Sequence, residues 1–530
     1  MEKTNKNLLL ALASGLILGL ATIIPWLNFL VFVGLIPLLN AIYNSRKKSF
    51  KDQFLLGFVA GSIYFGFVFL WLWATYPLNS FGIQNKLLAI GLIGFVYISS
   101  ILDTAIFWGL FSLFSAKVSS NKKYFAINSI SLFVIFEFFR SYAYGIFWAG
   151  SETLHGFHWT AGNLAYLTTW NHWVLLSASL WGIYGISALI IFINLLILFL
   201  LKSKIKNKKY FAVGIFVFVL ILGVSPLPKK GEGETITISA IQTEQEPREL
   251  TSAEMLKDFS NKISLLKESS RSNPSVIVFP ESSDFFKNIS SFLTTKEAKD
   301  FFESLFKGQP VVIIDNSKYV DENGLSKSRT IYLDPEGGIT GWYDKQLLMP
   351  IGEYAPYSMI SLGNLNKKLG DTVKNLKFYS KGDNFSKPVD FQGKKIGALI
   401  CSDMLSPDLS RSLSNLGANL IIYQTSESLF NGSTLLTNSN MSMAKMRSAE
   451  TGRPVIVSSN SGKSFVTSGQ GKTIKQSLNN GYTVVTSDIQ MSDNKTLNTK
   501  MGDRPIVLIL FGLFALVIFL ERRKRTSKIK

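Results

Sequence analysis

The sequence is poor in three kinds of residue: cysteine, histidine and charged residues. Of 530 residues, one is cysteine and three are histidine, and charged residues make up 17%. A single cysteine excludes a disulfide within the chain, a cysteine-cluster metal site and a CxxC redox pair. Soluble proteins carry about 25% charged residues. The low charge, together with 47% hydrophobic residues, therefore indicates a membrane protein.

The apolar residues are concentrated in runs long enough to span a bilayer, which takes about 17–25 residues. These runs lie at 7–24, 27–43, 54–76, 87–116, 124–147, 173–201, 210–225 and, shorter, 506–520. Between 229 and 504, short β-like runs alternate instead with amphipathic stretches and turns. We therefore expect a bundle of seven spans over 1–228, an α/β domain over 229–504, and an eighth span with a basic tail over 505–530.

The net charge of +19 could suggest a nucleic-acid partner, but its distribution indicates topology instead. The two tails and the connections after even-numbered spans hold 20 basic and 3 acidic residues, a net charge of +17. Connections after odd-numbered spans carry almost no Lys or Arg. The positive-inside rule then places both termini in the cytoplasm and the domain over 229–504 outside it. No nucleic-acid partner is expected.

Two acidic residues, Asp103 and Glu137, lie within predicted spans, where ionisable groups are costly and often functional. Arg140 follows Glu137 by one helical turn and would share its face. A structural ion pair inside the bundle is therefore at least as good an interpretation of Glu137 as a site.

Three segments of the predicted outer domain carry candidate catalytic residues. Val276-Ile-Val-Phe-Pro-Glu281 is a buried type of strand that ends in a carboxylate, and Lys395-Ile-Gly-Ala-Leu-Ile-Cys401-Ser-Asp403 is a strand that ends in the only cysteine. The third segment, Gly341-Trp-Tyr-Asp-Lys345, precedes Glu353. Open α/β sheets bind their ligands at the carboxyl ends of the strands.

Cys401 lies where a nucleophile is expected, between a strand and a predicted amphipathic helix over 405–416, with another strand over 419–424. A helix N-terminus and a nearby Lys would both favour its thiolate form. Taken alone, a cysteine after an apolar strand is more often a small buried hydrophobic residue than a nucleophile.

All three histidines lie between 155 and 172, so none is present in the predicted outer domain. A base for Cys401 must then be a carboxylate, and a neighbouring cation must stabilise the oxyanion. Glu281 and Lys345 are the candidates. Each alone could be a solvated charge at the end of a strand, but their combination and order favour a catalytic role.

These segments resemble motifs of the nitrilase (carbon–nitrogen hydrolase) superfamily, whose Glu-Lys-Cys triad occurs in this order. Phe279-Pro-Glu281-Ser is similar to its glutamate motif, Tyr343-Asp-Lys345 with Pro350-Ile-Gly-Glu353-Tyr to its lysine motif, and Ile400-Cys401-Ser-Asp403 to its cysteine motif. The run from Arg447 to Gly462 resembles the region that packs beneath the site. The implied fold is an αββα sandwich.

A nitrilase-like domain between seven spans and one span resembles the bacterial apolipoprotein N-acyltransferase family. Within the bundle, Phe136-Glu137-Phe-Phe-Arg140 and Gly182-Ile-Tyr-Gly-Ile-Ser187 are also similar to that family. Some family positions differ: Ser402 replaces the usual Tyr, Asp403 the usual Glu, 242–250 lacks a Trp, and 426–432 lacks Trp and His. These differences concern the acyl and acceptor pockets and leave the triad intact.

The resemblance implies an acyl transfer through a thioester on Cys401. The donor would be a membrane phospholipid, and the acceptor the N-terminal amine of a diacylglyceryl-cysteine apolipoprotein. Glu281 would be the base, and Lys345 with the backbone N–H of Ser402 would hold the oxyanion. Glu353 would be a second essential carboxylate or a structural contact to the Lys345 loop, and Asp403 a supporting residue. No cofactor or metal is implied, and a monomer in the bacterial inner membrane is expected.

Two other functions remain open on the sequence alone. One is a membrane-tethered nitrilase-type amidase that hydrolyses a small amide, for which seven spans are excessive. The other is a transporter or receptor bundle with a catalytically dead sensor domain, which the intact triad disfavours. The apolar stretch 347–362 is either a lid that dips into the bilayer or an ordinary core segment.

Overall fold

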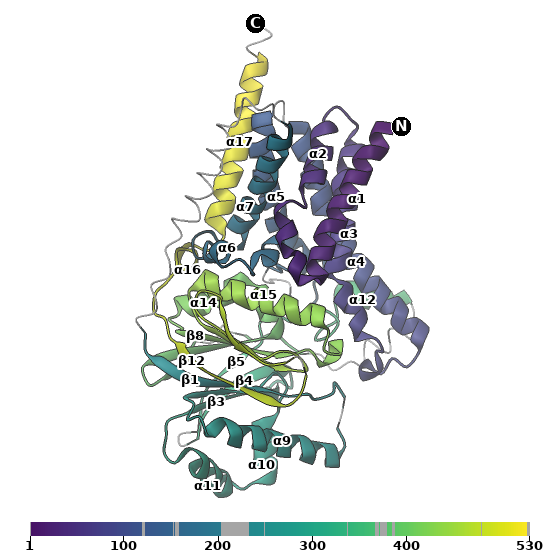
Figure 1. Cartoon of the computed structure of the whole chain (residues 1–530). Coiled ribbons are helices and arrows are strands. Elements are labelled where there is room, and N and C mark those ends of the chain that lie inside the picture. Colours follow the sequence, from purple (N-terminus) through teal and green to yellow (C-terminus); the bar gives the residue numbers. More distant parts are fainter. Residues whose placement is uncertain are drawn as a thin grey trace.

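The structure is a computed structural model in which the first half of the chain forms a helical bundle and the second half a β-sandwich (Figure 1). It describes residues 2–118, 122–151, 153, 158–202, 233–248, 250–335, 338–365, 370, 379–383, 387–478 and 480–526. The start of α1 and the end of α17 lie at the end of the bundle that is farthest from the sheets (Figure 1).

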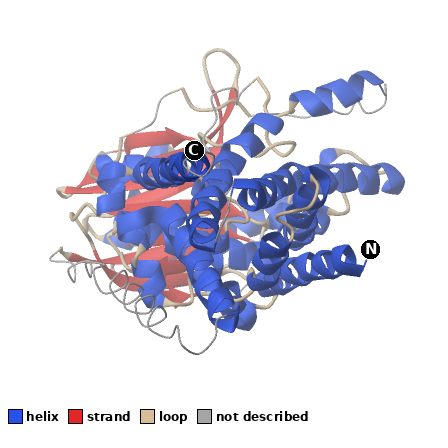
Figure 2. Ribbon diagram, turned by 90° about the horizontal axis from the view of Figure 1, so that it is seen from above, coloured by secondary structure: helices blue, strands red, loops and turns tan. Residues whose placement is uncertain are grey.

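The bundle consists of long apolar helices joined by short turns. Its elements are α1 (Glu2–Ile23), η1 (Pro25–Phe32), α2 (Ile36–Asn44), α3 (Phe50–Val68), η2 (Leu70–Thr75), η3 (Asn79–Phe81), α4 (Lys86–Val118), α5 (Lys122–Phe147), η4 (Leu164–Thr168), α6 (His172–Leu176), α7 (Ala178–Lys202) and α17 (Arg504–Thr526). Seen from above, these helices stand over the strands (Figure 2).

Seven stretches of the described residues are long and apolar enough to cross a membrane. They are 5–23, 25–44, 50–75, 86–118, 124–147, 178–202 and 504–523, and they match seven of the eight predicted runs. The eighth, 210–225, lies outside the described residues. The run predicted over 27–43 is divided into η1 and α2, because Pro37 stands at the start of α2 and has no N–H with which to continue a preceding helix.

The sandwich contains two six-stranded sheets, with strand orders β12-β1-β2-β3-β4-β5 and β11-β10-β9-β8-β7-β6. The strands are β1 (Thr235–Gln242), β2 (Val276–Val278), β3 (Val312–Val320), β4 (Ser326–Asp334), β5 (Gly338–Asp344), β6 (Val389–Phe391), β7 (Lys394–Ile400), β8 (Leu420–Ser426), β9 (Val455–Asn460), β10 (Phe465–Thr467), β11 (Thr473–Gln476) and β12 (Thr483–Gln490). The central strands pair in parallel: β1 with β2, β2 with β3, β7 with β8, and β8 with β9. Strands buried on both faces need continuous apolar sequence, which Val276–Val278 provides.

Helices cover the outer face of each sheet. α9 (Ser252–Ser270), α10 (Phe285–Phe292) and α11 (Thr295–Phe306) pack on the first sheet, whereas α14 (Pro407–Asn415) and α15 (Thr434–Thr451) lie between the second sheet and the bundle (Figure 1). A buried apolar cluster fills the space between the sheets. The layers are therefore helix, sheet, sheet, helix, which confirms the expected fold class of an apolar helical bundle with an αββα domain.

The charged residues inside the bundle form an ion pair. Arg140 Nη2 lies 3.1 Å from Glu137 Oε2, and Trp108 Nε1 donates to Glu137 Oε1 over 3.2 Å. Both charged side chains are almost fully buried. The structural interpretation of Glu137 therefore holds. Asp103 Oδ2 is buried and has no hydrogen-bond partner among the described residues.

The bundle and the sandwich meet through two segments that the sequence analysis singled out, the run that begins at Arg447 and the run 182–187. Arg447 Nη2 on α15 donates to Tyr166 OH over 3.1 Å, and Ile183 N on α7 donates to Glu450 Oε1 over 3.0 Å. Gly182, just before Ile183, has a φ of 62° and a ψ of −170°. This conformation is essentially restricted to glycine.

We expect Gly182→Ala to destabilise the folded chain by about 3 kcal/mol, because the backbone conformation is strained for alanine. A Cβ at this position would also lie 2.1 Å from Asp503 Oδ1. Thermal unfolding in detergent measures the change. Gly512→Ala on α17 is the matched control, since a Cβ there meets nothing within 4 Å. Equal melting temperatures for the two variants would contradict this prediction.

Candidate active site

The three residues predicted to form a triad lie at the carboxyl ends of three strands. Glu281 follows β2 after Phe279 and Pro280, Lys345 follows β5 directly, and Cys401 follows β7 and begins η6 (Cys401–Leu405). β2 and β5 belong to one sheet and β7 to the other. Packing of the two sheets against each other brings the three strand ends together, and the Nζ atom of Lys345 lies 3.0 Å from Glu281 Oε1.

Lys345 is held between two carboxylates. Its Nζ donates to Glu281 Oε1 over 3.0 Å and to Glu353 Oε1 over 2.8 Å. The other oxygen of Glu353 accepts a hydrogen bond from the backbone N–H of Met349 over 2.7 Å. Burial alone would lower the pKa of Lys345, but Glu281 and Glu353 raise it well above its usual value. The side chain is therefore a permanent cation inside the protein.

Glu281 is the buried carboxylate between Lys345 and Cys401. Only 7% of the residue is exposed, and burial raises its pKa, against the lowering effect of Lys345. The thiol of Cys401 lies close to Glu281 and lowers this pKa. A carboxylate with a raised pKa in contact with a thiol is suited to accept and return a proton near neutral pH.

Cys401 has a φ of +44°, which is unusual for a residue with a side chain. It stands in a strand–turn–helix arrangement, with α14 and β8 after the turn, much as the sequence predicts. The backbone N–H of Ser426 lies close to its sulfur and lowers the pKa of the thiol. The strained turn presents the sulfur towards Glu281, as in the nucleophile turns of other hydrolase folds.

One expectation about Cys401 is wrong. The sequence favours a thiolate, whereas burial and the nearby Glu281 raise the pKa of the thiol above its usual value, and Lys345 only partly opposes this. The charge of Lys345 is already neutralised by Glu281 and Glu353. The resting sulfur is therefore protonated, and its reaction requires a base.

Ser402 and Asp403 tie the cysteine turn to the lysine loop. Asp403 accepts hydrogen bonds from Tyr343 OH over 2.8 Å, Leu347 N over 2.7 Å and Ile400 N over 2.9 Å. The hydroxyl of Ser402 donates to the carbonyl of Leu347. Burial raises the pKa of Asp403 to about 6, and the backbone N–H donors oppose this. These contacts fix the separation between the turns that carry Lys345 and Cys401.

The segment 426–432, which the sequence marked only by its missing aromatic residues, contributes to the site. Ser426 contacts the thiol of Cys401, as described above. Glu427 is buried and accepts hydrogen bonds from Thr437 Oγ1 and Asn440 Nδ2. Burial raises its pKa to about 7. The signal that could have found these residues is their place at the carboxyl end of β8, next to β7 in the same sheet.

This same segment also binds to the bundle. The ring of Phe430 packs edge-on against Trp71 of η2, with 5.1 Å between the ring centroids. Asn431 Nδ2 donates to the carbonyl of Ala74 over 2.7 Å. A tryptophan from the bundle therefore packs directly on this segment of the α/β domain.

The stretch 347–362 is partly core and partly a contact to the bundle. Leu347 and Leu348 are buried in the α/β domain. Further along, Tyr354 OH donates to the carbonyl of Trp148 over 2.7 Å, and the N–H of Tyr357 donates to the carbonyl of Ala149 over 2.9 Å. Tyr357 begins α12 (Tyr357–Leu365), beside the end of α5.

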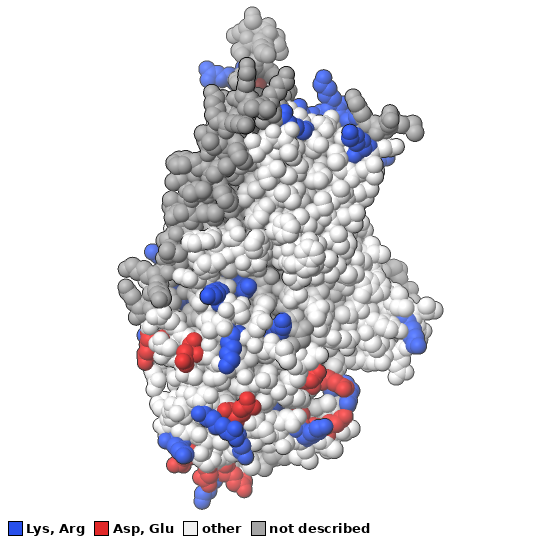
Figure 3. All heavy atoms as spheres, viewed as in Figure 1, with Lys and Arg blue, Asp and Glu red and all other residues white. Residues whose placement is uncertain are grey.

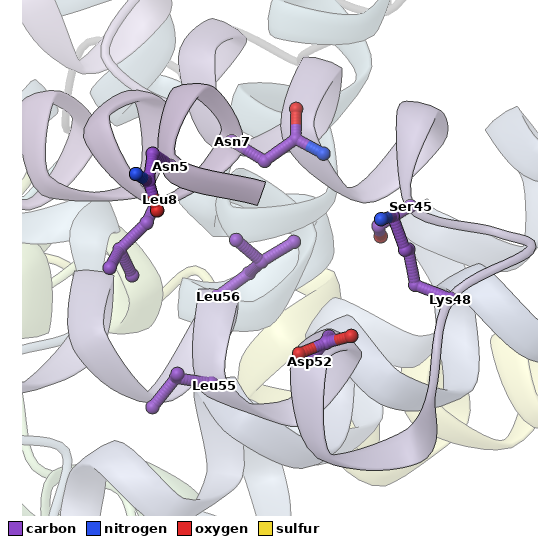
Figure 4. Close-up of a pocket in the computed structure, with 8 residues that line it drawn as sticks. All are labelled: Asn5, Asn7, Leu8, Ser45, Lys48, Asp52, Leu55 and Leu56. Atoms are coloured by element: carbon purple, nitrogen blue, oxygen red, sulfur yellow. The ribbon is translucent and has the colours of Figure 1, made fainter. Parts of the chain in front are cut away.

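A separate small pocket of about 50 Å³ lies at the opposite end of the bundle, between the start of α1 and the start of α3 (Figure 4). Asn5, Lys48 and Asp52 are among its lining residues. It shares no residue with the candidate active site. In the described part of the chain, no group of three or more His, Cys, Asp and Glu side chains is arranged to hold a metal ion.

The sandwich, with a Glu, a Lys and a Cys at its strand ends, defines the class of protein. Residues 237–498 match the carbon-nitrogen hydrolase family, and residues 14–196 match the apolipoprotein N-acyltransferase N-terminal domain. The chain belongs to the apolipoprotein N-acyltransferase family and is an enzyme of the acyltransferase type.

Known proteins extend this comparison over nearly the whole chain. An apolipoprotein N-acyltransferase from Gloeobacter violaceus is 24% identical, and the alignment covers 96% of this chain and 94% of that protein. One from Shewanella oneidensis is also 24% identical, over 44% of this chain and 41% of that protein. A carbon-nitrogen hydrolase structure from Helicobacter pylori is 18% identical, with a TM-score of 0.36, covering 51% of this chain and 92% of that one.

Proposed function

We propose that this chain transfers an acyl group from a membrane phospholipid to the N-terminal amine of a diacylglyceryl-cysteine apolipoprotein, through a thioester on Cys401. The observation that carries the proposal is the meeting of Glu281, Lys345 and Cys401 at strand ends beside an apolar bundle. Membership of the apolipoprotein N-acyltransferase family supports the same reaction. Neither the amidase nor the transporter alternative has comparable support.

In the first half-reaction, the sulfur of Cys401 attacks the carbonyl carbon of a phospholipid ester. Glu281 accepts the thiol proton as the C–S bond forms, because a protonated thiol is a poor nucleophile. Lys345 Nζ and the backbone N–H of Ser402 stabilise the tetrahedral oxyanion. When the intermediate collapses, the C–O bond breaks, and Glu281 returns its proton to the departing lysophospholipid oxygen. An acyl thioester remains on Cys401.

In the second half-reaction, the amine of the apolipoprotein attacks the thioester carbonyl. Glu281 accepts a proton from the amine nitrogen, the C–N bond forms, and the C–S bond breaks. The proton returns to the sulfur, which restores the resting thiol. A thioester favours attack by an amine over attack by water once the site is desolvated, and the burial of Glu281 and Lys345 supplies that environment.

The remaining candidate residues support Lys345 and Cys401 without reacting themselves. Glu353 fixes Lys345 Nζ through the 2.8 Å hydrogen bond, and Asp403 joins the lysine loop to the cysteine turn. Ser402 supplies the N–H for the oxyanion, and its hydroxyl anchors the turn to Leu347. We propose that Glu353 is essential because it places the cation.

The raised pKa of Glu281 predicts how the reaction depends on pH. The base is active only when ionised, so its activity is lost as the pH falls through its folded-state pKa. Because that pKa lies above the usual value for glutamate, we expect the acid limb of acyl-enzyme formation above pH 4.5, the usual value. Single-turnover rates across pH measure it. An acid limb at or below the usual value would contradict the assignment of Glu281.

The proposed function is tested by measuring the intact mass of the purified protein after exposure to phospholipid vesicles. We expect one added acyl chain, located on Cys401 by peptide mapping and removed by a diacylglyceryl-cysteine peptide. Rapid turnover of a small amide without any adduct would instead support the amidase, and the absence of both would overturn the proposed reaction.

We propose that the enzyme resides in the bacterial inner membrane as a monomer, with both termini in the cytoplasm and the α/β domain outside. The proposed domain limits are 1–228, 229–504 and 505–530. On the face in Figure 3, Lys and Arg gather at the end of the bundle where α1 begins, and charges of both signs are mixed over the sandwich. Lys and Arg concentrate on the cytoplasmic side of membrane proteins.

This orientation predicts the result of a topology experiment. A reporter that is active only outside the cytoplasm, fused after Gly233, should be active. The same reporter fused within the tail after Arg523 should be silent, which provides the control. The reverse pattern would overturn the orientation and leave the enzyme without access to exported lipoproteins.

A further inference from the structure

The loop that carries Glu281 has an unusual backbone. Ser282 has a φ of 59° and Asp284 a φ of 51°, both in the left-handed region. Residues with side chains are disfavoured there by roughly 1–2 kcal/mol each. Two such residues directly after the proposed general base persist only if the surrounding structure holds the loop in place.

Ser283 lies between these two residues and is held from two sides by buried charged groups. Lys262 Nζ on α9 donates to the carbonyl of Ser283 over 2.5 Å, and the hydroxyl of Ser283 donates to Asp315 Oδ1 on β3. Neither Lys262 nor Asp315 is exposed to solvent, and Ser283 is only 1% exposed. The two contacts reach Ser283 from elements on either side of it in the sequence.

Each charged group has further partners that fix it. Asp315 Oδ2 accepts a hydrogen bond from the N–H of Phe286, in the first turn of α10, over 3.0 Å. Burial raises the pKa of Asp315 to about 7, and the hydrogen bonds from Ser283 and Phe286 oppose this. Lys262 also pairs with Asp258, one helical turn earlier, over 2.5 Å. Groups with several fixed partners have little freedom to move, so they are suited to hold Ser283.

The next residue along β3 strengthens the arrangement. Asn316 Oδ1 accepts a hydrogen bond from the N–H of Ser282 over 2.8 Å, and its carbonyl accepts one from the N–H of Asp284 over 3.1 Å. The loop after Glu281 is therefore bound at three consecutive residues.

We propose that Lys262 and Asp315, through Ser283, position the carboxylate of Glu281 between the thiol of Cys401 and Lys345. None of the three residues touches the reacting atoms, so each is a positioning residue. The inference rests on the function proposed above, since it takes Glu281 to be the base that removes the proton of Cys401. A base that is misplaced by about 1 Å loses much of its effect.

The single cysteine offers a direct test that needs no lipid substrate. Cys401 is the only cysteine of the chain, so the rate of iodoacetamide addition, followed by intact mass, reports the reactivity of its sulfur alone. We expect Ser283→Ala to slow alkylation at neutral pH roughly tenfold, a part of the 10²–10⁴-fold effect of a general base. Ser283→Thr, which keeps the hydroxyl, should stay within about threefold of the unaltered protein.

Three comparisons make the test decisive. Ser290→Ala on α10 is the matched control, because its exposed hydroxyl bonds only to the carbonyl of Lys287 in the same helix, and its rate should not change. Thermal unfolding of each variant in detergent shows whether the fold is kept. Glu281→Gln, which removes the base itself, should slow alkylation at least as much as Ser283→Ala.

Slow alkylation of Ser283→Ala, with recovery in Ser283→Thr and similar melting temperatures, supports the positioning role. Two results would overturn it while leaving the proposed function intact. In the first, Ser283→Ala is alkylated at the rate of the unaltered protein while Glu281→Gln is alkylated slowly. In the second, Ser283→Ala and Ser283→Thr are alkylated equally slowly and have equally lowered melting temperatures. If Glu281→Gln is alkylated at an unchanged rate, Glu281 is not the base, and both proposals are overturned.

Discussion

Cys401→Ala should form no acyl-enzyme and should lose N-acylation of lipoproteins by at least about 10⁴-fold, the scale of losses when a nucleophile is removed. The chain contains no other thiol, so no neighbouring cysteine can substitute for it. Intact mass after exposure to phospholipid, and transfer of labelled acyl groups to a diacylglyceryl-cysteine peptide, measure the two half-reactions separately.

This variant should otherwise resemble the unaltered protein. Alanine keeps the Cβ of Cys401, so the strain of the positive φ is unchanged. It also fills most of the same buried space, so membrane insertion and thermal unfolding should change little. Cys401→Ser is the second variant: it keeps a hydroxyl beside Glu281, and we expect at most a slowly formed oxygen ester. Full acylation activity in Cys401→Ala would overturn the proposed mechanism.

Lys345→Met should prevent thioester formation altogether. Lys345 is the shared partner of Glu281 and Glu353, at 3.0 Å and 2.8 Å, so its removal leaves a buried and a half-buried carboxylate without a cation. The pKa of Glu281, already raised by burial, would rise further, and the oxyanion would lose its positive partner. Both effects act on the first half-reaction, so the adduct mass should be missing.

The loss of a buried ion-pair partner also destabilises a protein, by about 3–5 kcal/mol, so the fold must be checked separately. Lys345→Arg keeps the charge and should insert and fold, yet it should form the thioester slowly, because the guanidinium group cannot occupy the position of Nζ. Lys475→Met makes the same change on exposed strand β11 and should leave the adduct intact. If a folded Lys345→Met variant forms a normal amount of acyl-enzyme, Lys345 does not stabilise the oxyanion.

The features of the sequence that extend over many residues, above all the apolar runs, predicted the fold well. Seven of eight apolar runs coincide with membrane-length helices, because about 20 consecutive apolar residues have few folding options besides a buried or membrane helix. The strands that end at Glu281 and Cys401 were visible as short apolar runs. Boundaries were less certain: the run over 27–43 contains two helices, and a proline rather than hydropathy decides where the second begins.

The protonation state of Cys401 could not be predicted from the sequence. Its immediate neighbours suggested a helix N-terminus and a lysine, both of which favour a thiolate. What decides the pKa is burial and the carboxylate of Glu281, which is 120 positions earlier in the chain. The contacts of Ser426 and Phe430 were missed for the same reason, since one partner of each lies in a distant segment.

The sequence by itself determined the number and placement of most spans, the location of the positive charge, and the order of Glu281, Lys345 and Cys401, because each depends on residues that are near one another or on composition. Only the tertiary structure decided how these residues act on one another. The two sheets had to pack against each other before Cys401 could lie beside Glu281 and Lys345. Likewise, α9 and β3 had to close on Ser283 before the base had a fixed position. Distances of about 3 Å between side chains from different strands are set by packing, and local sequence carries no record of them.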